Sequence, residues 1–159
     1  MQTRSEDFAG TPKNRQVLDR TAIGLLLHDA GMSKIPAFIL DKTQNITQEE
    51  RQKILKHPML GIEMLSKLDL KFPEVEHCML HHHERLNGSG YPQKLSGEAI
   101  PETGLLCAVV DSYCAMITDR PYAKAMDPKA AAGALGTDAR YDSRVSKQLV
   151  NYLLNARLM

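Results

Sequence analysis

Apolar residues recur at helical spacing through most of the chain, and the residues between them supply signals for helix starts and stops. Thr11 and Pro12 form a start signal, with Thr as the cap and Pro in the first turn. The apolar positions that follow have the period of a helix, which we expect to end near Gly31. These positions are Val17, Leu18, Ala22, Leu25 and Leu26.

Capping residues and prolines divide the rest of the chain into further helices. A capping box begins at Thr47, prolines open two helices, and aspartates are suitable caps for the last two. The predicted helices cover residues 47–57, 58–68, 73–86 and 102–118, and the last two begin at Asp127 and Asp142. Residues 32–46 and 87–101 are expected to be loops. Because strand signals are few and no internal repeat is present, the pattern predicts an all-α fold, a bundle of roughly six to seven helices.

Composition narrows the class of protein. The chain has 159 residues and a formal net charge of +1, which suits one domain and gives no field favouring DNA or an anionic membrane. The longest apolar stretch, about residues 105–110, is too short to span a bilayer, and the polar start lacks a secretory signal. Three cysteines without paired spacing indicate free thiols in a reducing compartment. We therefore expect a cytoplasmic protein without membrane insertion and without DNA binding.

Four groups of histidine and aspartate are spaced as if for one metal site. His57 follows His28 by 29 residues and precedes His82 by 25, and Asp111 follows His83 by 28. Each gap has about the length of a pair of helices, so a string of antiparallel helices can bring the groups to one point. Histidine and aspartate bind Zn, Fe or Mn while leaving positions open for water. Taken together, the groups, which include Asp29 beside His28, predict a metal site of the hydrolase type.

Each group has a simpler explanation when it is taken alone. The pair His28-Asp29 is consistent with a core histidine and a capping aspartate, and His57 before Pro58 with a helix junction. The histidine run 81–83 is consistent with a solvated helix face, although three consecutive imidazoles far from a terminus argue against it. Asp111 lies between apolar residues and needs a partner if it is buried, but a surface position explains it equally well. Adjacent residues point about 100° apart on a helix, so neighbouring ligands are expected only at helix ends or close packing points.

A longer block around the second histidine pair resembles the HD-GYP domain, a branch of the HD superfamily of metal-dependent phosphohydrolases. The block begins with His82-His83-Glu84 and ends with Gly90-Tyr91-Pro92. The similarity covers roughly residues 17–158 and continues through Leu95, Gly97, Ile100-Pro101, Asp111 and Arg120-Pro121-Tyr122. The resemblance implies a bacterial signalling domain with an all-helical fold that hydrolyses cyclic di-GMP to pGpG or GMP by means of a metal-bound hydroxide.

The resemblance also implies roles for individual residues. Asp29 would bridge two ions and act as the catalytic residue, and Fe or Mn would be preferred over Zn, Ni or Mg, with one or two ions bound. The implied metal ligands are His28, Asp29, His57, His82, His83 and Asp111. The implied substrate-binding residues are Arg85, Tyr91, Arg120 and Tyr122. The implied partners are cyclic di-GMP or a related dinucleotide, GGDEF-type cyclase domains and a second copy of the chain in a homodimer.

Several positions depart from the pattern of this family. Met32 and Ala123 stand where family members usually carry cations that contact phosphate, and Cys114 stands where a second Asp is usual. No histidine precedes His28, whereas the family has another ligand on a helix further upstream. We therefore expect a tail over residues 1–12 and, over residues 13–159, an HD-GYP-like domain that lacks the first ligand helix. One metal position, formed by Asp29 and the histidines 57, 82 and 83, would be complete.

Three functions are consistent with these observations. The first is a cyclic di-GMP phosphodiesterase, favoured by the retained ligands. The second is a catalytically impaired domain that binds the dinucleotide or docks a partner, favoured by Met32, Cys114 and Ala123. The third is another HD-type phosphohydrolase acting on nucleotides, which the Gly-Tyr-Pro loop argues against.

Overall fold

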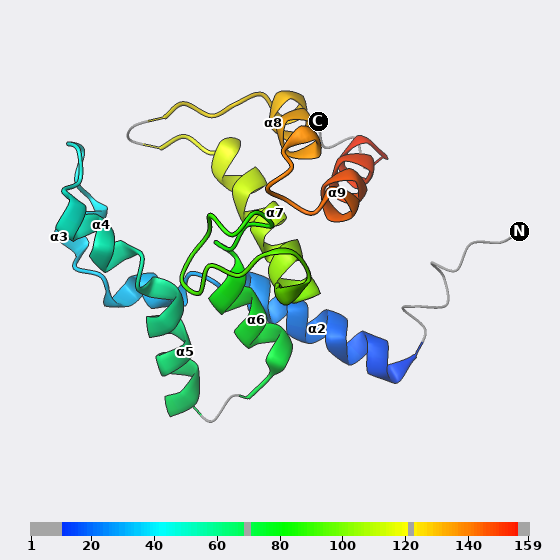
Figure 1. Cartoon of the computed structure of the whole chain (residues 1–159), viewed down its shortest axis with the longest axis horizontal. Helices are drawn as coiled ribbons and strands as arrows, with labels where there is room; N and C mark the ends of the chain where they lie inside the picture. The colour runs from blue at the N-terminus through cyan, green and yellow to red at the C-terminus, as the bar shows by residue number, and fades with distance from the viewer. Residues whose placement is uncertain (1–10, 69–70, 121–122, 156–159) are drawn as a thin grey trace, which may run out of the picture.

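The computed structural model describes residues 11–68, 71–120 and 123–155, and within them the chain is helical (Figure 1). Seven α-helices have seven or more residues, in agreement with the predicted all-α bundle, and a four-residue helix and two 3-10 turns complete the fold. No strand occurs in these ranges; two isolated bridges are present. The elements are α2 (Pro12–Leu27), η1 (Ala30–Lys34), α3 (Ala37–Leu40), α4 (Gln48–Ile54), α5 (His57–Lys67), α6 (Pro73–His81), η2 (Gly97–Ala99), α7 (Glu102–Met116), α8 (Pro128–Thr137) and α9 (Ser143–Asn155).

The predicted helix starts are confirmed by the capping hydrogen bonds. Thr11 accepts a hydrogen bond from the backbone of Asn14 at the start of α2, and both halves of the capping box at Thr47 are formed. Asp127 and Asp142 cap α8 and α9 through their carboxylates, as expected. Short polar side chains therefore fix where these helices begin.

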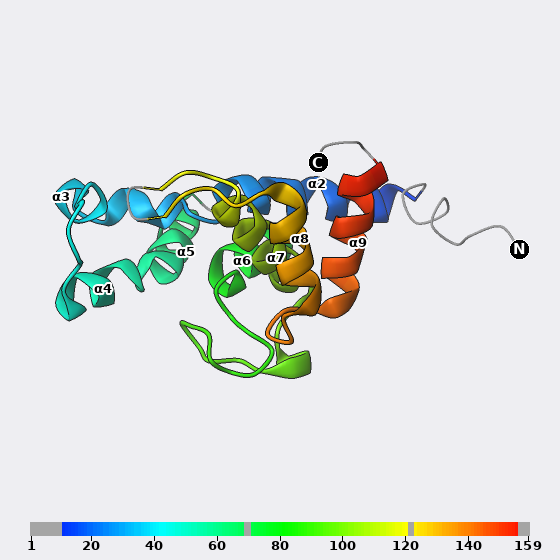
Figure 2. The same ribbon diagram turned by 90° about the horizontal axis from the view of Figure 1, so that it is seen from above.

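The helices form two hydrophobic cores. The larger core lies between α7 and the α8–α9 hairpin and includes Val109, Tyr113, Leu135 and Leu153. The smaller one lies between α5 and α6 and is built on Leu65, Val75 and Met79. Helix α6 packs against α2, α5 and α7, so it joins the two halves of the molecule. In Figure 2, α3 and α4 lie at one end of the elongated molecule and α9 lies towards the other.

Several details of the helix pattern differ from prediction, and one is that α2 ends at Leu27 although an end near Gly31 was expected. The segment 32–46 is not a plain loop, because η1 and α3 occupy much of it. The buried side of α2 is formed by Thr21 and Gly24, whereas Leu18 and Leu26 of the predicted apolar stripe are exposed, at 46% and 85%. The apolar stripe did not predict the buried face because α2 contacts α6 through small residues, which let the two backbones approach closely. Among the described residues, no helix is long and apolar enough to cross a membrane.

Candidate metal centre

Five of the six predicted ligands lie at helix ends, where neighbouring side chains can point the same way, and the sixth, Asp111, lies within α7. His28 is the C-cap of α2, and Asp29 follows it with φ −96° and ψ 9°, outside the helix. The helix that includes His82 and His83 was predicted to run to residue 86, but α6 ends at His81. His82 is its C-cap, and the imidazole centroids of His82 and His83 lie 4.1 Å apart. On a continuous helix these two side chains would diverge by about 100°.

One carboxylate and three imidazoles meet in a compact cluster. The ligand atoms of Asp29, His57, His82 and His83 all lie within 4.8 Å of one another. Asp29 Oδ1 is 3.1 Å from His57 Nε2 and 3.5 Å from His82 Nε2, and these two nitrogens are 3.1 Å apart. His57 and His82 are almost fully buried, while the Asp29 side chain is 51% exposed. The cluster is therefore open to ligands on the side of Asp29.

Backbone carbonyls hold the imidazoles in the orientation that metal binding needs. His57 Nδ1 is 2.8 Å from the Ile54 carbonyl, and His82 Nδ1 is 3.0 Å from the Cys78 and Met79 carbonyls. A carbonyl accepts hydrogen bonds only, so each Nδ1 carries a proton, and Nε2 is the ring atom that faces the cluster, where it offers a lone pair to a metal whenever it is unprotonated. Two lone pairs 3.1 Å apart repel unless a proton or a cation lies between them. The donor set therefore fits a divalent transition metal ion.

The second oxygen of Asp29 faces a different set of groups. Asp29 Oδ2 is 3.7 Å from His28 Nε2, which is 3.6 Å from Asp111 Oδ1 on α7. His28 Nδ1 is 2.7 Å from the Leu25 carbonyl, so this ring is oriented in the same way as the other two. The two oxygens of Asp29 thus face two different groups of candidate ligands.

The neighbours of these groups set their protonation. Burial lowers the pKa of His83 to about 3, and the adjacent His82 adds to the effect. Burial opposes ionisation of Asp29, but hydrogen bonds with His57 and His82 outweigh it and hold the pKa of Asp29 well below its usual range. Burial also opposes protonation of His28, but the hydrogen bond with Asp111 and further contacts raise the pKa of His28 to about 9. An ionised Asp29 and a neutral His83 are the forms that bind metals.

A close backbone contact brings His57 to the cluster. Gly31 in η1 packs against the first turn of α5, and a Cβ added at Gly31 would lie 1.9 Å from the His57 carbonyl oxygen. Any side chain at this position would push α5 away from the end of α2. The glycine therefore sets the distance between Asp29 and His57.

The loop over residues 86–96 is fastened by the buried carboxylate of Glu84. Its side chain accepts hydrogen bonds from the backbone N–H groups of Gln93 at 2.7 Å and Leu95 at 3.1 Å. Gly90 packs on the same turn, since a Cβ there would lie 2.4 Å from Glu84 Cα. Tyr91 is thereby held with its ring stacked on His83, at a centroid distance of 4.5 Å and an interplanar angle of 22°.

Arg85 is engaged by protein groups on several sides. Its guanidinium donates to the His82 carbonyl at 3.0 Å and to the Glu84 carbonyl at 2.7 Å, and it lies over the ring of Tyr141. It also approaches the hydroxyl of Ser112, which is bonded to the Tyr141 hydroxyl at 2.9 Å. Arg85 lines the pocket, as its predicted role requires, but these contacts occupy most of its donors.

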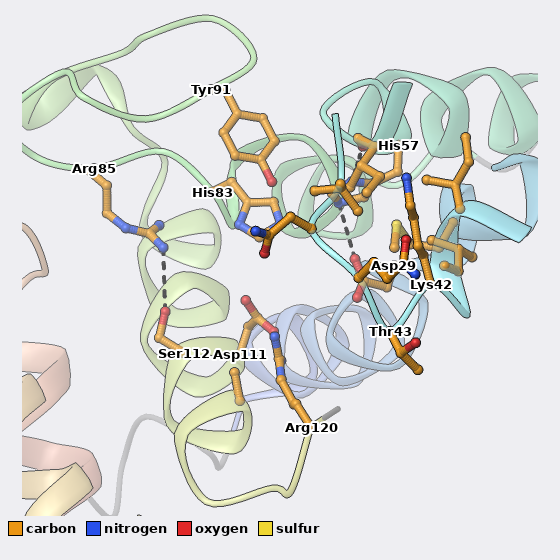
Figure 3. A pocket seen from close by; sticks show the side chains of 18 residues that line it. Asp29, Lys42, Thr43, His57, His83, Arg85, Tyr91, Asp111, Ser112 and Arg120 are labelled. Carbon is orange, nitrogen blue, oxygen red and sulfur yellow. Dashed lines mark hydrogen bonds and ion pairs between the residues drawn. The ribbon is translucent and has the colours of Figure 1, made fainter. Parts of the chain in front are cut away.

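Asp29, His57 and His83 of the cluster line a pocket of about 770 Å³, which Figure 3 shows from close by. Its lining includes the predicted substrate-binding residues Arg85, Tyr91 and Arg120. Tyr122 lies outside the described residues. The volume falls within the range of small-molecule sites, about 300–1,000 Å³. The structure thus brings candidate metal ligands and three of the four predicted substrate-binding residues to one accessible cavity.

The positions that depart from the family pattern have different surroundings. Met32 lines the pocket and supplies no charge there, whereas Lys34 is exposed and is not part of its lining. Cys114, which stands where a second Asp is usual, is exposed and outside the lining. Ala123 is exposed and pairs through its backbone with Arg120.

Sequence reasoning missed three contributors to the site. Glu84 was seen only as part of a motif, although an acidic residue beside two metal-ligand candidates is a signal for a positioning role. Ser112 follows Asp111 and had no signal of its own. The polar segment 42–46 was placed in a loop, yet all five of its residues line the pocket. Only the fold reveals that this loop turns back over Asp29.

The comparisons with known proteins agree with this geometry. A family model described as HD domain matches residues 9–145, which is most of the chain. A relative named cyclic di-GMP phosphodiesterase response regulator RpfG, from Xanthomonas campestris, is 41% identical over 110 residues, covering 69% of this chain and 29% of the relative.

Two further relatives are named as phosphodiesterases of two different cyclic dinucleotides. One, named as a cyclic di-GMP phosphodiesterase of Pseudomonas aeruginosa, is 35% identical and covers 82% of this chain and 31% of the relative. The other, named 3'3'-cGAMP-specific phosphodiesterase 2 of Vibrio cholerae, is 35% identical and covers 60% of this chain and 19% of the relative. The chain thus spans less than a third of the length of these three relatives. The match over residues 9–145 confirms the resemblance, and the chain belongs to the HD domain family as an HD-GYP-type member.

Proposed function

We propose that this chain is a metal-dependent phosphodiesterase that opens cyclic di-GMP to linear pGpG or GMP. The observation that carries the proposal is the meeting of Asp29 Oδ1 with the Nε2 atoms of the buried His57 and His82, beside an open pocket that Asp29 and His57 line. Relatives named for this activity support the same reaction. A catalytically impaired binding domain is less favoured, because the relatives with this region are named as phosphodiesterases.

The donor set supports a first metal position at Asp29, His57, His82 and His83. Three nitrogens and one oxygen suit a divalent transition metal ion, and on the family resemblance we propose Fe or Mn ahead of Zn, Ni or Mg. A second, weaker position would use Asp29 Oδ2, His28 and Asp111, which makes Asp29 the bridging ligand. When bound, such ions supply Lewis acids that activate water as a nucleophile and offset charge on the phosphoryl oxygens.

The residues around the cluster have distinct tasks in this proposal. Asp29 would contribute to both metal positions through its carboxylate. Tyr91, stacked on His83, presents an aromatic surface against which a guanine base can lie. Arg120 contributes a positive charge from another wall, where it can contact a phosphate (Figure 3). Together these groups would place the scissile phosphate over the metal positions.

Product analysis tests the proposal directly. Protein loaded with Mn²⁺ or Fe²⁺ is incubated with cyclic di-GMP, and in parallel with 3'3'-cGAMP, and the linear products are separated by chromatography. We expect pGpG or GMP from cyclic di-GMP, with at least 100-fold less product from the variant Asp29→Asn (on the order of the effect of losing an essential group). Asp19→Asn, an exposed aspartate of α2, is the matched control. The absence of linear product at high concentrations of metal-loaded protein would overturn the proposal, and cleavage of 3'3'-cGAMP alone would change its substrate.

The expected GGDEF-type partners and the homodimer stay predictions. Analytical ultracentrifugation of the chain, alone and mixed with a GGDEF domain, tests both.

A further inference from the structure

The pocket needs positive charge for a phosphodiester anion, and few described residues supply it. Three side chains in its lining carry a fixed positive charge, namely Lys42, Arg85 and Arg120. Arg85 already donates to two backbone carbonyls and lies over Tyr141. Of the described lining residues, this leaves Lys42 and Arg120 to meet the charge of a ligand.

Lys42 lies in the polar segment 42–46, between α3 and α4. In Figure 3 the labelled residues of this segment, Lys42 and Thr43, lie on the side of the pocket away from Arg85. The Lys42 side chain is 25% exposed, so its ammonium is partly shielded from solvent. A charge in such a position attracts an anion more strongly than a charge on the open surface does.

Glu50 holds the Lys42 ammonium in place. Lys42 Nζ is 2.9 Å from one carboxylate oxygen of Glu50 and 2.7 Å from the other. Glu50 Oε2 also accepts from the backbone N–H of Thr47 in the capping box of α4, so its position is fixed. An ammonium has three donors, and the Glu50 carboxylate is therefore an internal competitor for part of its hydrogen-bonding capacity.

We propose that Lys42 is a phosphate-binding residue of this pocket and that Glu50 restrains it by competing with the substrate anion. This inference builds on the proposed function and names a residue of the same site. Because Met32 supplies no charge, Lys42 would provide the cationic contact on its side of the pocket, with Arg120 on another. A purely structural role is the alternative, in which the Lys42–Glu50 pair serves only to order the turn before α4.

The two roles predict different effects of Lys42→Met and Glu50→Gln on substrate binding. In the proposal, Lys42→Met removes a phosphate contact, whereas Glu50→Gln removes the competitor and keeps a side chain that completes the capping box. The first should therefore weaken and the second strengthen substrate binding. In the structural alternative both break the same ion pair, so both change binding and stability in the same direction.

The test is steady-state hydrolysis of cyclic di-GMP by the Mn²⁺-loaded protein, with urea unfolding of each variant. We expect Lys42→Met to raise KM about 10- to 100-fold, the range for a hydrogen bond to a charged group, with kcat within about threefold. Glu50→Gln should lower KM about two- to fivefold. Lys34→Met, which removes an exposed lysine outside the lining, should leave KM unchanged.

Two results overturn the inference and are distinguishable from each other. Equal KM for Lys42→Met and wild type, or a shift of KM in the same direction in both variants, overturns it while the proposed function stands. A wild-type protein that does not hydrolyse cyclic di-GMP overturns the proposed function, and the phosphate-binding role of Lys42 falls with it.

Discussion

At the residue scale, the site depends on hydrogen bonds between the imidazole Nδ1 atoms and backbone carbonyls, on the side of each ring that faces away from the cluster. Three imidazoles have Nδ1 within 3.0 Å of backbone carbonyls, which leaves Nε2 facing Asp29 or Asp111. The sequence indicated which histidines and aspartates would meet, because these residue types stand out among apolar neighbours. It could not indicate which ring nitrogen faces the cluster, because this depends on where the backbone places the carbonyl that accepts the Nδ1 hydrogen bond.

Arg85 illustrates the same limit. Its place in the motif suggested a substrate contact, but a guanidinium has five donors, and the fold directs several of them to His82, Glu84 and Ser112. We therefore expect Arg85 also to position the end of α6 relative to α7.

Replacing Arg85 tests this positioning role. Arg85→Met should lower the free energy of unfolding by about 1–3 kcal/mol, because buried carbonyls lose their donors. It should also weaken metal binding about 10- to 100-fold, since the backbone of His82 loses a support. Urea unfolding and metal titration measure the two effects. Arg144→Met, at a side chain that is 72% exposed, is the matched control. Unchanged metal affinity in Arg85→Met would contradict the positioning role.

At the scale of elements, the starts of helices were predictable and their ends were less so. Starts depend on capping side chains that can be read directly, such as Thr11, Thr47 and Asp127. The end of α6 depends on two features that no capping residue indicates. His82 Nδ1 hydrogen-bonds to the carbonyls of the last turn, and Glu84 holds the loop over residues 86–96. Likewise, the apolar stripe of α2 did not identify its buried face.

The contact between η1 and α5 predicts that a methyl group at Gly31 destabilises the protein, and a control glycine is expected to show the opposite change in stability. Gly31→Ala places a methyl group against the His57 carbonyl and should destabilise the fold by about 1–3 kcal/mol or more, while weakening metal binding. Gly133→Ala on α8 meets nothing within 4 Å and should stabilise the protein by about 0.5–1 kcal/mol. Thermal unfolding and metal titration of both variants check this. A Gly31→Ala protein with wild-type stability and metal affinity would mean that the close contact is not needed.

At the scale of the whole molecule, the candidate metal site takes its ligands from four helices, and α6 packs against each of the other three. Its ligands come from the ends of α2 and α6, the start of α5 and the middle of α7, while the two hydrophobic cores lie on either side. A metal bound by these ligands connects the α5–α6 core to the α7–α9 core. The overall bundle was predictable from helical periodicity, but this central position of the site follows from packing that no local pattern specifies.

Metal binding should therefore stabilise the whole bundle. An ion present at a hundred times its dissociation constant adds about 2.7 kcal/mol to the free energy of unfolding. We expect Mn²⁺ to raise the midpoint of urea unfolding and a chelator to reverse the change, in one cooperative transition. A midpoint that does not respond to Mn²⁺, Fe²⁺ or Zn²⁺ would contradict a structural link through the metal.

The most direct test of the account is the metal content per chain. Protein loaded with Mn²⁺ or Fe²⁺ and freed of unbound metal by gel filtration is analysed by elemental mass spectrometry, beside the double variant His57→Ala, His82→Ala. The account predicts at least about one ion per chain in the wild type and almost none in the variant, because the four ligands of the first position are the tightest site. A wild-type protein without bound metal, or equal metal content in both proteins, would contradict the claim that these side chains form a metal centre.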